Sequence, residues 1–431
     1  MWEKYIEKDS RIIRPLDGYE CVLIYSYLNV IDVFPEFSIE DFRKSAQENL
    51  SNIEFFNINI KLMDNHSFWI RKPFKINLKE IPWTEKEEIE ELLKNEHETM
   101  TPLQKVYDEE EKDIIIPFLF EICRLKNNKI KLKFSVIHAM SDGRTIFYMY
   151  DLLRKIINGE KLEKMDVIIP PFNQLGNFHD LNPSIYEETP KTWKEINELS
   201  ILPKILKPEG YVTVHNIYNY PPISKFCKEN NVTVQAMLIA MATRTARKFN
   251  NLPKETPIWN YTPCDARPSK FSTETFKNQK FFCNAGALFP CVIGQNTLLE
   301  DIKYCNKKLL ESKETYDNIA QILMSGKSID PNTLKYTLPE KMPDFHKQPV
   351  TVASNIGKIN GNNPLLYLSM DCPNEFYTFA THSYHTDEKI YMATLMPINF
   401  DKNYYNCLKE EMDLIFNIQL ISKNNQKKIY I

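Results

Sequence analysis

The feature that most constrains the fold is an apolar hairpin that delivers a histidine to the end of a strand. The two predicted strands span residues 113–123 and 129–137, and both are rich in isoleucine, leucine and phenylalanine. Asn127-Asn128 lies between them, and asparagine tolerates the positive φ that a tight hairpin turn requires. Pro117 lacks a backbone N–H, so it predicts an edge position or a bulge in the first arm. The second arm leads directly to His138.

The segment that ends this hairpin reads Phe134-Ser-Val-Ile-His138-Ala-Met-Ser-Asp142-Gly143. Residues 145–157 follow with an amphipathic pattern, which predicts a helix, and the glycine of Asn158-Gly159 suits the C′ position after it. Gly143 is assigned to the turn between strand and helix. We therefore expect His138 at the rim of a sheet, followed by a short turn and a helix.

Strands and helices alternate along the rest of the chain, with a break in the middle. Six prolines interrupt the segment from residue 160 to about 208, so we expect it to join two lobes. The predicted lobes are residues 1–165 and 209–431, with a linker over 166–208. Further strands are predicted at 19–33, 55–63, 211–218, 257–263, 285–293, 349–354, 376–381 and 389–396. Further helices are predicted at 38–50 and 84–97 behind capping boxes, at 234–248 behind Thr233, and at 298–310 and 402–420.

Composition excludes several classes of protein. The net charge of −3 over 431 residues gives no electrostatic reason to expect a nucleic-acid partner. Only 10 glycines occur, and both common glycine-rich phosphate motifs are absent. The nine cysteines are dispersed, which favours reduced thiols over disulfides or a zinc site. No secretory signal or membrane-spanning apolar run is present, so we expect a cytoplasmic protein.

His138 is the candidate catalytic residue. An imidazole with a pKa of about 6.5 has its base form available at neutral pH, and it could take a proton from a hydroxyl or an amine. Asp142 has two possible roles. It orients the imidazole, or it pairs with an arginine and fixes the turn that positions His138.

Arg267 is the candidate arginine for that pair. It lies in Asn260-Tyr-Thr-Pro-Cys-Asp265-Ala-Arg267-Pro268, where a predicted strand runs into a charged turn. An Arg267–Asp142 contact would join the two lobes. The alternative is a surface ion pair between Asp265 and Arg267.

Small polar residues end another predicted strand, in Val352-Ala-Ser354-Asn355-Ile-Gly357. A hydroxyl, an amide or backbone N–H groups in this position could stabilise an oxyanion, so Ser354, Asn355 and Gly357 are candidates for that role. The alternative is an ordinary turn. His382 and His385 could line a pocket, but they lack partners at ligand spacing, so no metal site is expected.

The strand end, His138-Ala-Met-Ser-Asp142-Gly143 and the amphipathic helix together resemble the H-x-x-x-D-G motif of the chloramphenicol acetyltransferase-like acyltransferases. That superfamily includes alcohol acetyltransferases, plant-type BAHD acyltransferases, carnitine acyltransferases and the condensation domains of peptide synthetases. The resemblance extends over the layout of nearly the whole chain, but it is specific only at residues 134–153, with weaker support at 260–268 and 352–358. Ile137 replaces a histidine usual in condensation domains and the plant-type D-F-G-W-G motif is absent, so the chain looks most like alcohol acetyltransferase-like proteins.

The resemblance implies an α/β chain with mixed sheets, folded into two similar lobes with a tunnel between them. It implies that His138 is the general base, that Asp142 pairs structurally with Arg267, and that Ser354, Asn355 and Gly357 lie near an oxyanion site or groove. The implied reaction moves an acyl group, most simply acetyl, from coenzyme A to an alcohol or amine without a covalent intermediate. Acyl-CoA is then a co-substrate, and no permanently bound cofactor, metal or nucleic acid is expected.

Two alternatives to this function are open from the sequence. One is a catalytically inactive binding or scaffold protein of the same fold. The other is a condensation-like enzyme whose donor is held by a carrier protein. A chain with both lobes can complete the tunnel alone, so a monomer or weak oligomer is expected.

Overall fold

The computed structural model describes residues 3–16, 18–24, 26–87, 106–167, 211–268, 272–283, 285–288, 290–315, 350–360, 364–370, 380–397 and 402–417. Most of the predicted helix at 84–97 and of the predicted linker at 166–208 lies outside these residues. The same is true of the first part of the strand predicted at 376–381.

The first lobe contains a four-stranded and a five-stranded sheet. Its elements are α1 (Glu3–Lys8), β1 (Ile12–Pro15), α2 (Gly18–Leu23), β2 (Ser26–Pro35), α3 (Ile39–Ser51), η1 (Glu54–Asn57), β3 (Ile58–Met63), β4 (His66–Arg71), β5 (Leu78–Ile81), η2 (Glu85–Glu87), β6 (Ile114–Ile115), β7 (Phe118–Leu125), β8 (Lys129–Ile137), η3 (His138–Met140) and α5 (Gly143–Ile157). The four-stranded sheet has the order β1-β4-β3-β6 and is antiparallel throughout. Helices α3 and α5 contact each other, and α5 packs on β2.

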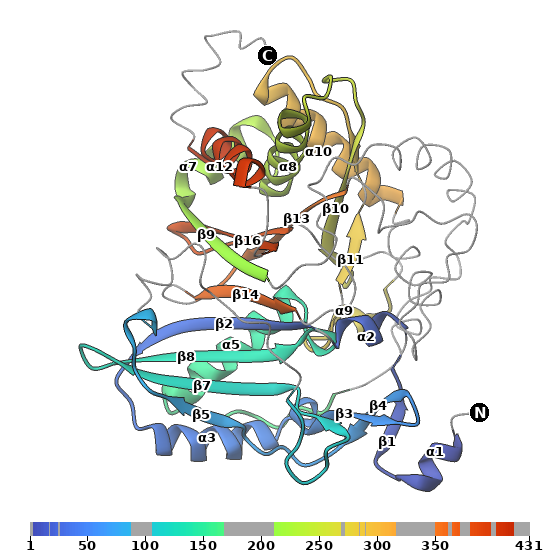
Figure 1. Ribbon diagram of the computed structural model, residues 1–431, viewed down its shortest axis with the longest axis vertical. Coiled ribbons are helices and arrows are strands. Elements are labelled where there is room, and N and C mark those ends of the chain that lie inside the picture. The colour runs from blue at the N-terminus through green and yellow to red at the C-terminus, as the bar shows by residue number, and fades with distance from the viewer. Residues whose placement is uncertain are drawn as a thin grey trace.

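The second lobe is built on a seven-stranded mixed sheet. Its elements are β9 (Tyr211–Asn219), α7 (Tyr220–Asn230), α8 (Val234–Asn250), β10 (Ile258–Asp265), α9 (Glu274–Lys277), β11 (Ala285–Leu288), β12 (Cys291–Val292), α10 (Leu298–Thr315), β13 (Val350–Lys358), β14 (Leu365–Met370), β15 (Ala380–His385), β16 (Lys389–Pro397) and α12 (Lys402–Phe416). The sheet has the order β11-β10-β13-β15-β16-β9, with β12 also paired to β10. The helices α7, α8, α10 and α12 lie together at the end of the molecule remote from the first lobe (Figure 1).

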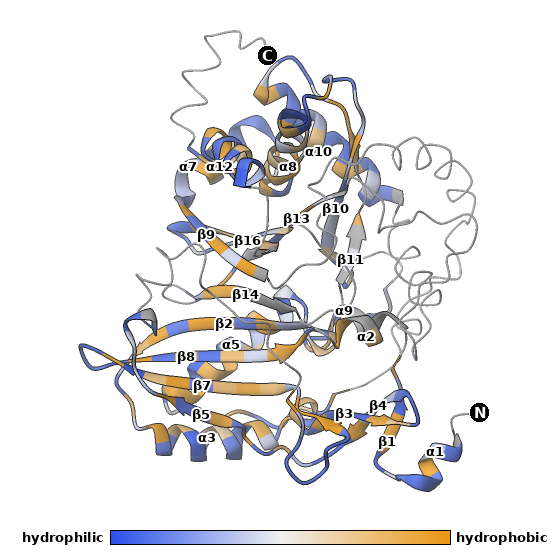
Figure 2. Ribbon diagram, viewed as in Figure 1, coloured by the Kyte–Doolittle hydropathy of each residue, from blue (hydrophilic) through white to orange (hydrophobic). Residues whose placement is uncertain are grey.

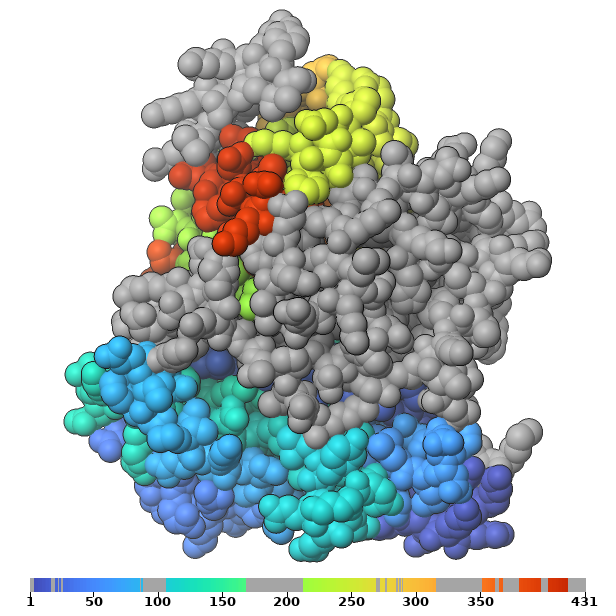
Figure 3. All heavy atoms as spheres, in the orientation of Figure 1, coloured from blue at the N-terminus to red at the C-terminus, as the bar shows by residue number. Residues whose placement is uncertain are grey.

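The two lobes are joined by strand exchange and by a shared core. Strand β14 comes from the second half of the chain but pairs antiparallel with β2, and it completes the order β14-β2-β8-β7-β5 (Figure 1). The core of the first lobe extends to Tyr384, Tyr391 and Ala393 on β15 and β16. Helix α8 and its neighbours cover the opposite face of the seven-stranded sheet with a separate core. Orange in Figure 2 marks hydrophobic residues, and many of them lie on strands β2, β8 and β7. Figure 3 shows the described N-terminal and C-terminal residues at opposite ends of the molecule.

The hairpin predicted before His138 is present as β7 and β8. Asn127 and Asn128 have φ values of 67° and 53°, as a tight turn between these strands requires. Gly159 has a φ of 80° after α5, which confirms the predicted end of that helix. The expectation for Pro117 is wrong: it marks the point where the chain passes from β6 in one sheet to β7 in the other.

Two predicted strands begin later than expected. The strand predicted at 19–33 is helix α2 followed by β2, because Glu20 is buried in an ion pair with Arg14 and Cys21 and Ile24 are buried at helical spacing. The strand predicted at 55–63 begins at Ile58, after the short helix η1. In each case the early apolar residues pack from a helical turn.

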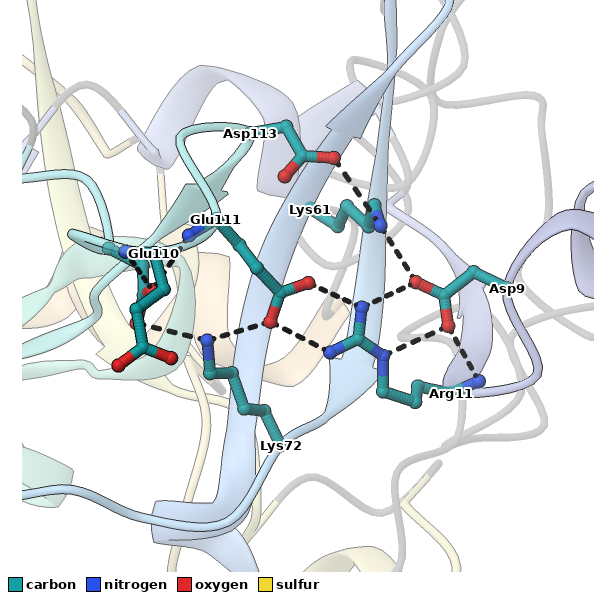
Figure 4. Close-up of polar contacts among 8 residues, drawn as sticks. Asp9, Arg11, Lys61, Lys72, Glu110, Glu111 and Asp113 are labelled. Carbon is teal, nitrogen blue, oxygen red and sulfur yellow. Dashed lines mark hydrogen bonds and ion pairs between the residues drawn. The ribbon is translucent and has the colours of Figure 1, made fainter.

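A network of charged side chains fixes the N-terminal corner of the four-stranded sheet (Figure 4). Arg11 Nη2 lies 2.8 Å from Asp9 Oδ2 and 2.6 Å from Glu111 Oε2. Lys61 Nζ also lies 2.7 Å from Asp9 Oδ2, and Lys72 Nζ lies 2.8 Å from Glu111 Oε1. The network therefore ties the segment before β1 to β3 and to the loop before β6.

The remaining sequence expectations concern membranes and thiols. None of the described helices is long and apolar enough to cross a membrane. None of the eight cysteines among the described residues forms a disulfide with another of them.

Candidate active site

His138 begins the short helix η3 directly after strand β8, and its side chain is partly exposed. Nδ1 lies 2.8 Å from the carbonyl oxygen of Ser141. Because a carbonyl oxygen only accepts, Nδ1 carries the proton and Nε2 is left with its lone pair. Burial lowers the pKa of His138 below its usual value, although hydrogen bonds to the backbone oppose this effect. The imidazole is therefore a neutral base at neutral pH.

Asp142 is the N-cap of α5, and both of its carboxylate oxygens have partners there. Oδ1 accepts hydrogen bonds from the backbone N–H groups of Arg144 and Thr145, at 2.9 and 2.8 Å. Oδ2 lies 3.2 Å from Nη2 of Arg267. Of the two roles open to Asp142, this geometry matches pairing with arginine, since the backbone carbonyl of Ser141 orients the imidazole of His138.

Arg267 is buried where the two lobes meet, and its contact with Asp265 is not a surface ion pair. Its Nη1 lies 2.9 Å from Asp265 Oδ1, at the end of β10. Its Nη2 donates to Thr145 Oγ1 at 2.9 Å, and Nε donates to the carbonyl of Gln279 at 2.6 Å. Its side chain is only 9% exposed. The charged turn after β10 is thereby anchored to the first turn of α5, next to His138.

Gly143 has a different role from the one expected. It is the first residue of α5, and the positive φ that favours glycine is found at Gly159 and Gly357 among the described glycines but not here. A Cβ atom at Gly143 would lie 2.7 Å from Cγ1 of Ile356 on β13. The glycine is needed because the two lobes approach closely at this point.

Asn355 and Gly357 form a bulge in β13 that is engaged with its own lobe. Asn355 Oδ1 accepts hydrogen bonds from Ser383 Oγ and from the N–H of Gly357, both at 3.1 Å. The N–H of Asn355 donates to Gln235 Oε1 on α8 at 2.7 Å. Gly357 has a φ of 94°, which suits the bulge. The structure therefore turns Asn355 towards the helices of the second lobe, and not towards the first lobe.

Ser354 projects from the opposite face of β13, because side chains alternate along a strand. Ile356, on the same face, packs against the core of the first lobe. Ser354 is 6% exposed, and its Oγ donates to the carbonyl of Pro263 at 3.3 Å. Its hydroxyl proton is therefore already engaged within the sheet.

His382 also belongs to this face. It lies on β15, directly beside Ser354 in the parallel register of β13 and β15. Tyr384 follows on the same face and packs against Phe147 of α5, with ring centroids 5.2 Å apart. Burial, and then the charge of a protonated His138, lower the pKa of His382 to about 4. The two imidazoles are therefore close enough to interact.

The described residues show no sign of a metal centre. None of their histidine, cysteine and carboxylate side chains gather in groups of three or more that could hold an ion. The functional groups that the structure brings together are those of acid–base chemistry.

The arrangement of the two lobes matches that of solved condensation-type structures. The chain is similar to polyketide synthase associated protein 5 from Mycobacterium tuberculosis, with a TM-score of 0.63, 11% identity, and coverage of 94% of this chain and 98% of that one. It is similar to the condensation domain of the Monacolin K polyketide synthase MokA, with a TM-score of 0.61, 12% identity, and coverage of 96% and 98%. It is also similar to the epimerization domain from the third module of tyrocidine synthetase B, with a TM-score of 0.60, 10% identity, and coverage of 98% and 96%.

This chain has the two-lobed condensation fold. No protein-family model matches its sequence, and no curated protein does either. At identities of 12% or less the likeness concerns the fold alone. The resemblance to alcohol acetyltransferases stays a prediction.

Proposed function

We propose that this chain transfers an acyl group from a thioester to a hydroxyl or amine acceptor, with His138 as the general base. The hydrogen bond between His138 Nδ1 and the carbonyl of Ser141 carries this proposal, because it fixes the tautomer in which Nε2 is basic. The lowered pKa of His138 keeps that nitrogen unprotonated at neutral pH.

The proposed reaction needs no covalent enzyme intermediate. Nε2 of His138 takes the proton of the acceptor as its oxygen or nitrogen attacks the thioester carbonyl carbon, and the electron pair of the C=O bond moves to oxygen. Collapse of this oxyanion breaks the C–S bond. The departing thiolate then takes the proton back from His138. Asp142 and Arg267 hold the loop that carries His138 between the two lobes.

The donor we favour is a thioester on the phosphopantetheine arm of a carrier protein, with acyl-CoA as the second candidate. The observation behind this order is that several of the structural neighbours are condensation or epimerization domains of a polyketide synthase and of antibiotic synthetases. Both donors present the same thioester group, so the chemistry at His138 is the same. They differ in what the arm is attached to, a nucleotide in acyl-CoA and a protein in the acylated carrier.

The test is thiol release from acyl-CoA and from acylated carrier protein, each with a panel of alcohols and amines. Acyl transfer by the wild-type chain, lost by at least about a hundredfold in His138→Ala, is the expected result. Release only from the acylated carrier protein would identify that donor, and release from acyl-CoA would identify the second candidate. Equal rates of transfer for wild type and His138→Ala would overturn the role of His138, and no transfer by wild type with either donor would favour a scaffold protein.

A further inference from the structure

The face of the second lobe that is turned to His138 needs a hydrogen-bond donor for the oxyanion. The three residues expected to provide one are engaged elsewhere. Asn355 lies on the helix side of β13, where its Oδ1 accepts from Ser383 Oγ and from the N–H of Gly357, and the hydroxyl of Ser354 donates to Pro263. A different side chain must supply the donor if the developing charge is stabilised from this sheet.

His382 is a candidate for this donor. It neighbours Ser354 in the register of β13 and β15, and it shares a face with Tyr384, which packs on α5. Its side chain is partly exposed, and its ring nitrogens make no hydrogen bond to other residues in the described part of the chain. His215, two strands along on the same face, is different, because its Nε2 already donates to the carbonyl of Leu366.

We propose that an imidazole N–H of His382 donates a hydrogen bond to the oxyanion that forms when the acceptor attacks the thioester carbonyl. This inference rests on the proposed function. It assigns the stabilisation of the oxyanion to a residue of β15. The acceptor proton passes to Nε2 of His138 while the carbonyl oxygen gains its charge beside His382. When the oxyanion collapses, the C–S bond breaks and the thiolate takes the proton from His138. His382 keeps its own proton throughout.

The protonation states of the two histidines support this division of roles. With a pKa of about 4, His382 is a neutral imidazole at neutral pH, and a neutral imidazole can polarise a carbonyl through its N–H. Because each positive charge disfavours the other, the imidazolium formed at His138 prevents His382 from taking a second proton. The transferred proton therefore remains on His138, where the leaving group needs it.

The first test compares three variants in the acyl-transfer assay. His382→Ala should lower kcat by about 10²–10³-fold with a small change in KM, as for loss of one oxyanion donor. His382→Gln keeps an N–H donor and should recover at least about tenfold of that loss. His385→Ala is the matched control, because His385 is on the same strand but on the opposite face, stacked on Tyr220 with ring centroids 3.8 Å apart.

The outcomes separate this inference from the proposed function. If His138→Ala loses activity while His382→Ala matches His385→Ala, only the role of His382 is overturned. If wild type shows no transfer with either donor, both proposals fail. If kcat falls in His382→Ala and is not partly recovered in His382→Gln, His382 has a structural role, and this result would also overturn the inference.

A second test needs no substrate. Histidine ring signals observed by NMR over a pH titration should show His382 titrating at about pH 4 in the wild type. His138→Gln removes the charge that His138 acquires on protonation, so the pKa of His382 should rise while that of His385 is unchanged. An unchanged pKa of His382 in His138→Gln would show that the two imidazoles do not face one another and would overturn the proposal.

Discussion

Replacement of Asp142 tests whether the motif aspartate is structural. Asp142→Ala removes an N-cap, which costs about 1 kcal/mol, and it leaves Arg267 without one of its carboxylates. Breaking a buried ion pair from one side costs about 3–5 kcal/mol, and the lower value applies because Arg267 keeps Asp265. We therefore expect a loss of about 4 kcal/mol in the free energy of unfolding. Asp142→Asn still caps the helix and should cost about 1 kcal/mol less.

The measurement is urea unfolding followed by tryptophan fluorescence, with turnover measured where every variant is folded. His138→Ala is the control, since it should lose turnover with little change in the free energy of unfolding. The double variant Asp142→Asn with Arg267→Gln should be more stable than the sum of the single losses predicts, because the two groups interact directly. The reasoning is refuted if Asp142→Ala unfolds at the wild-type urea concentration. It is also refuted if Asp142→Asn abolishes turnover without loss of stability, since the carboxylate would then act on the imidazole.

The contact at Gly143, the pKa of His138 and the ion pairs of Glu111 each give a further prediction. Gly143→Ala places a Cβ 2.7 Å from Ile356 Cγ1 and should destabilise the chain by about 1–3 kcal/mol, and in urea unfolding the loss in the double variant with Ile356→Ala should be smaller than the sum of the two single losses. Burial lowers the pKa of His138, and the reaction requires the base form of His138. The value of kcat/KM should therefore be constant at neutral pH and fall only below the ordinary histidine pKa of about 6.5. Hydrogen bonds from Arg11 and then Lys72 lower the pKa of Glu111 to about 2, so its contribution to stability is complete above its unfolded pKa and is lost as the pH falls towards 2. In Glu111→Gln the stability should fall less steeply as the pH is lowered. An equally steep fall would contradict the assignment of this acid sensitivity to Glu111.

The segment around His138 was predictable because its signals are local. The Asn127-Asn128 turn and the glycine after α5 each act within a few residues, and both are found where the sequence places them. The contact between Asp142 and Arg267 was also within reach, because two complementary charges at predicted strand ends suggested it. Local chemistry therefore determined the position of His138, the proposed base.

The long-range pairing of strands was not predictable in the same way. Strand β14 is a short apolar segment of the second half, and nothing within it indicates that its partner is β2 in the first lobe. The role of Gly143 depends on Ile356, which approaches only after the lobes have packed. These features arise from the tertiary arrangement, and their residues show no distinctive local pattern.

The candidates for oxyanion stabilisation show how strand register changes a prediction made from residues that are adjacent in the sequence. Ser354 and Asn355 are neighbours in the sequence, but the period of two sends their side chains to opposite faces of β13. His382 is distant in the sequence, yet the parallel pairing of β13 with β15 sets it beside Ser354 and on the face turned to α5. A contiguous polar segment is therefore a weaker guide to this site than one face of several paired strands. On this reasoning Asn355→Ala should weaken the bulge, whereas His382→Ala should slow the chemistry.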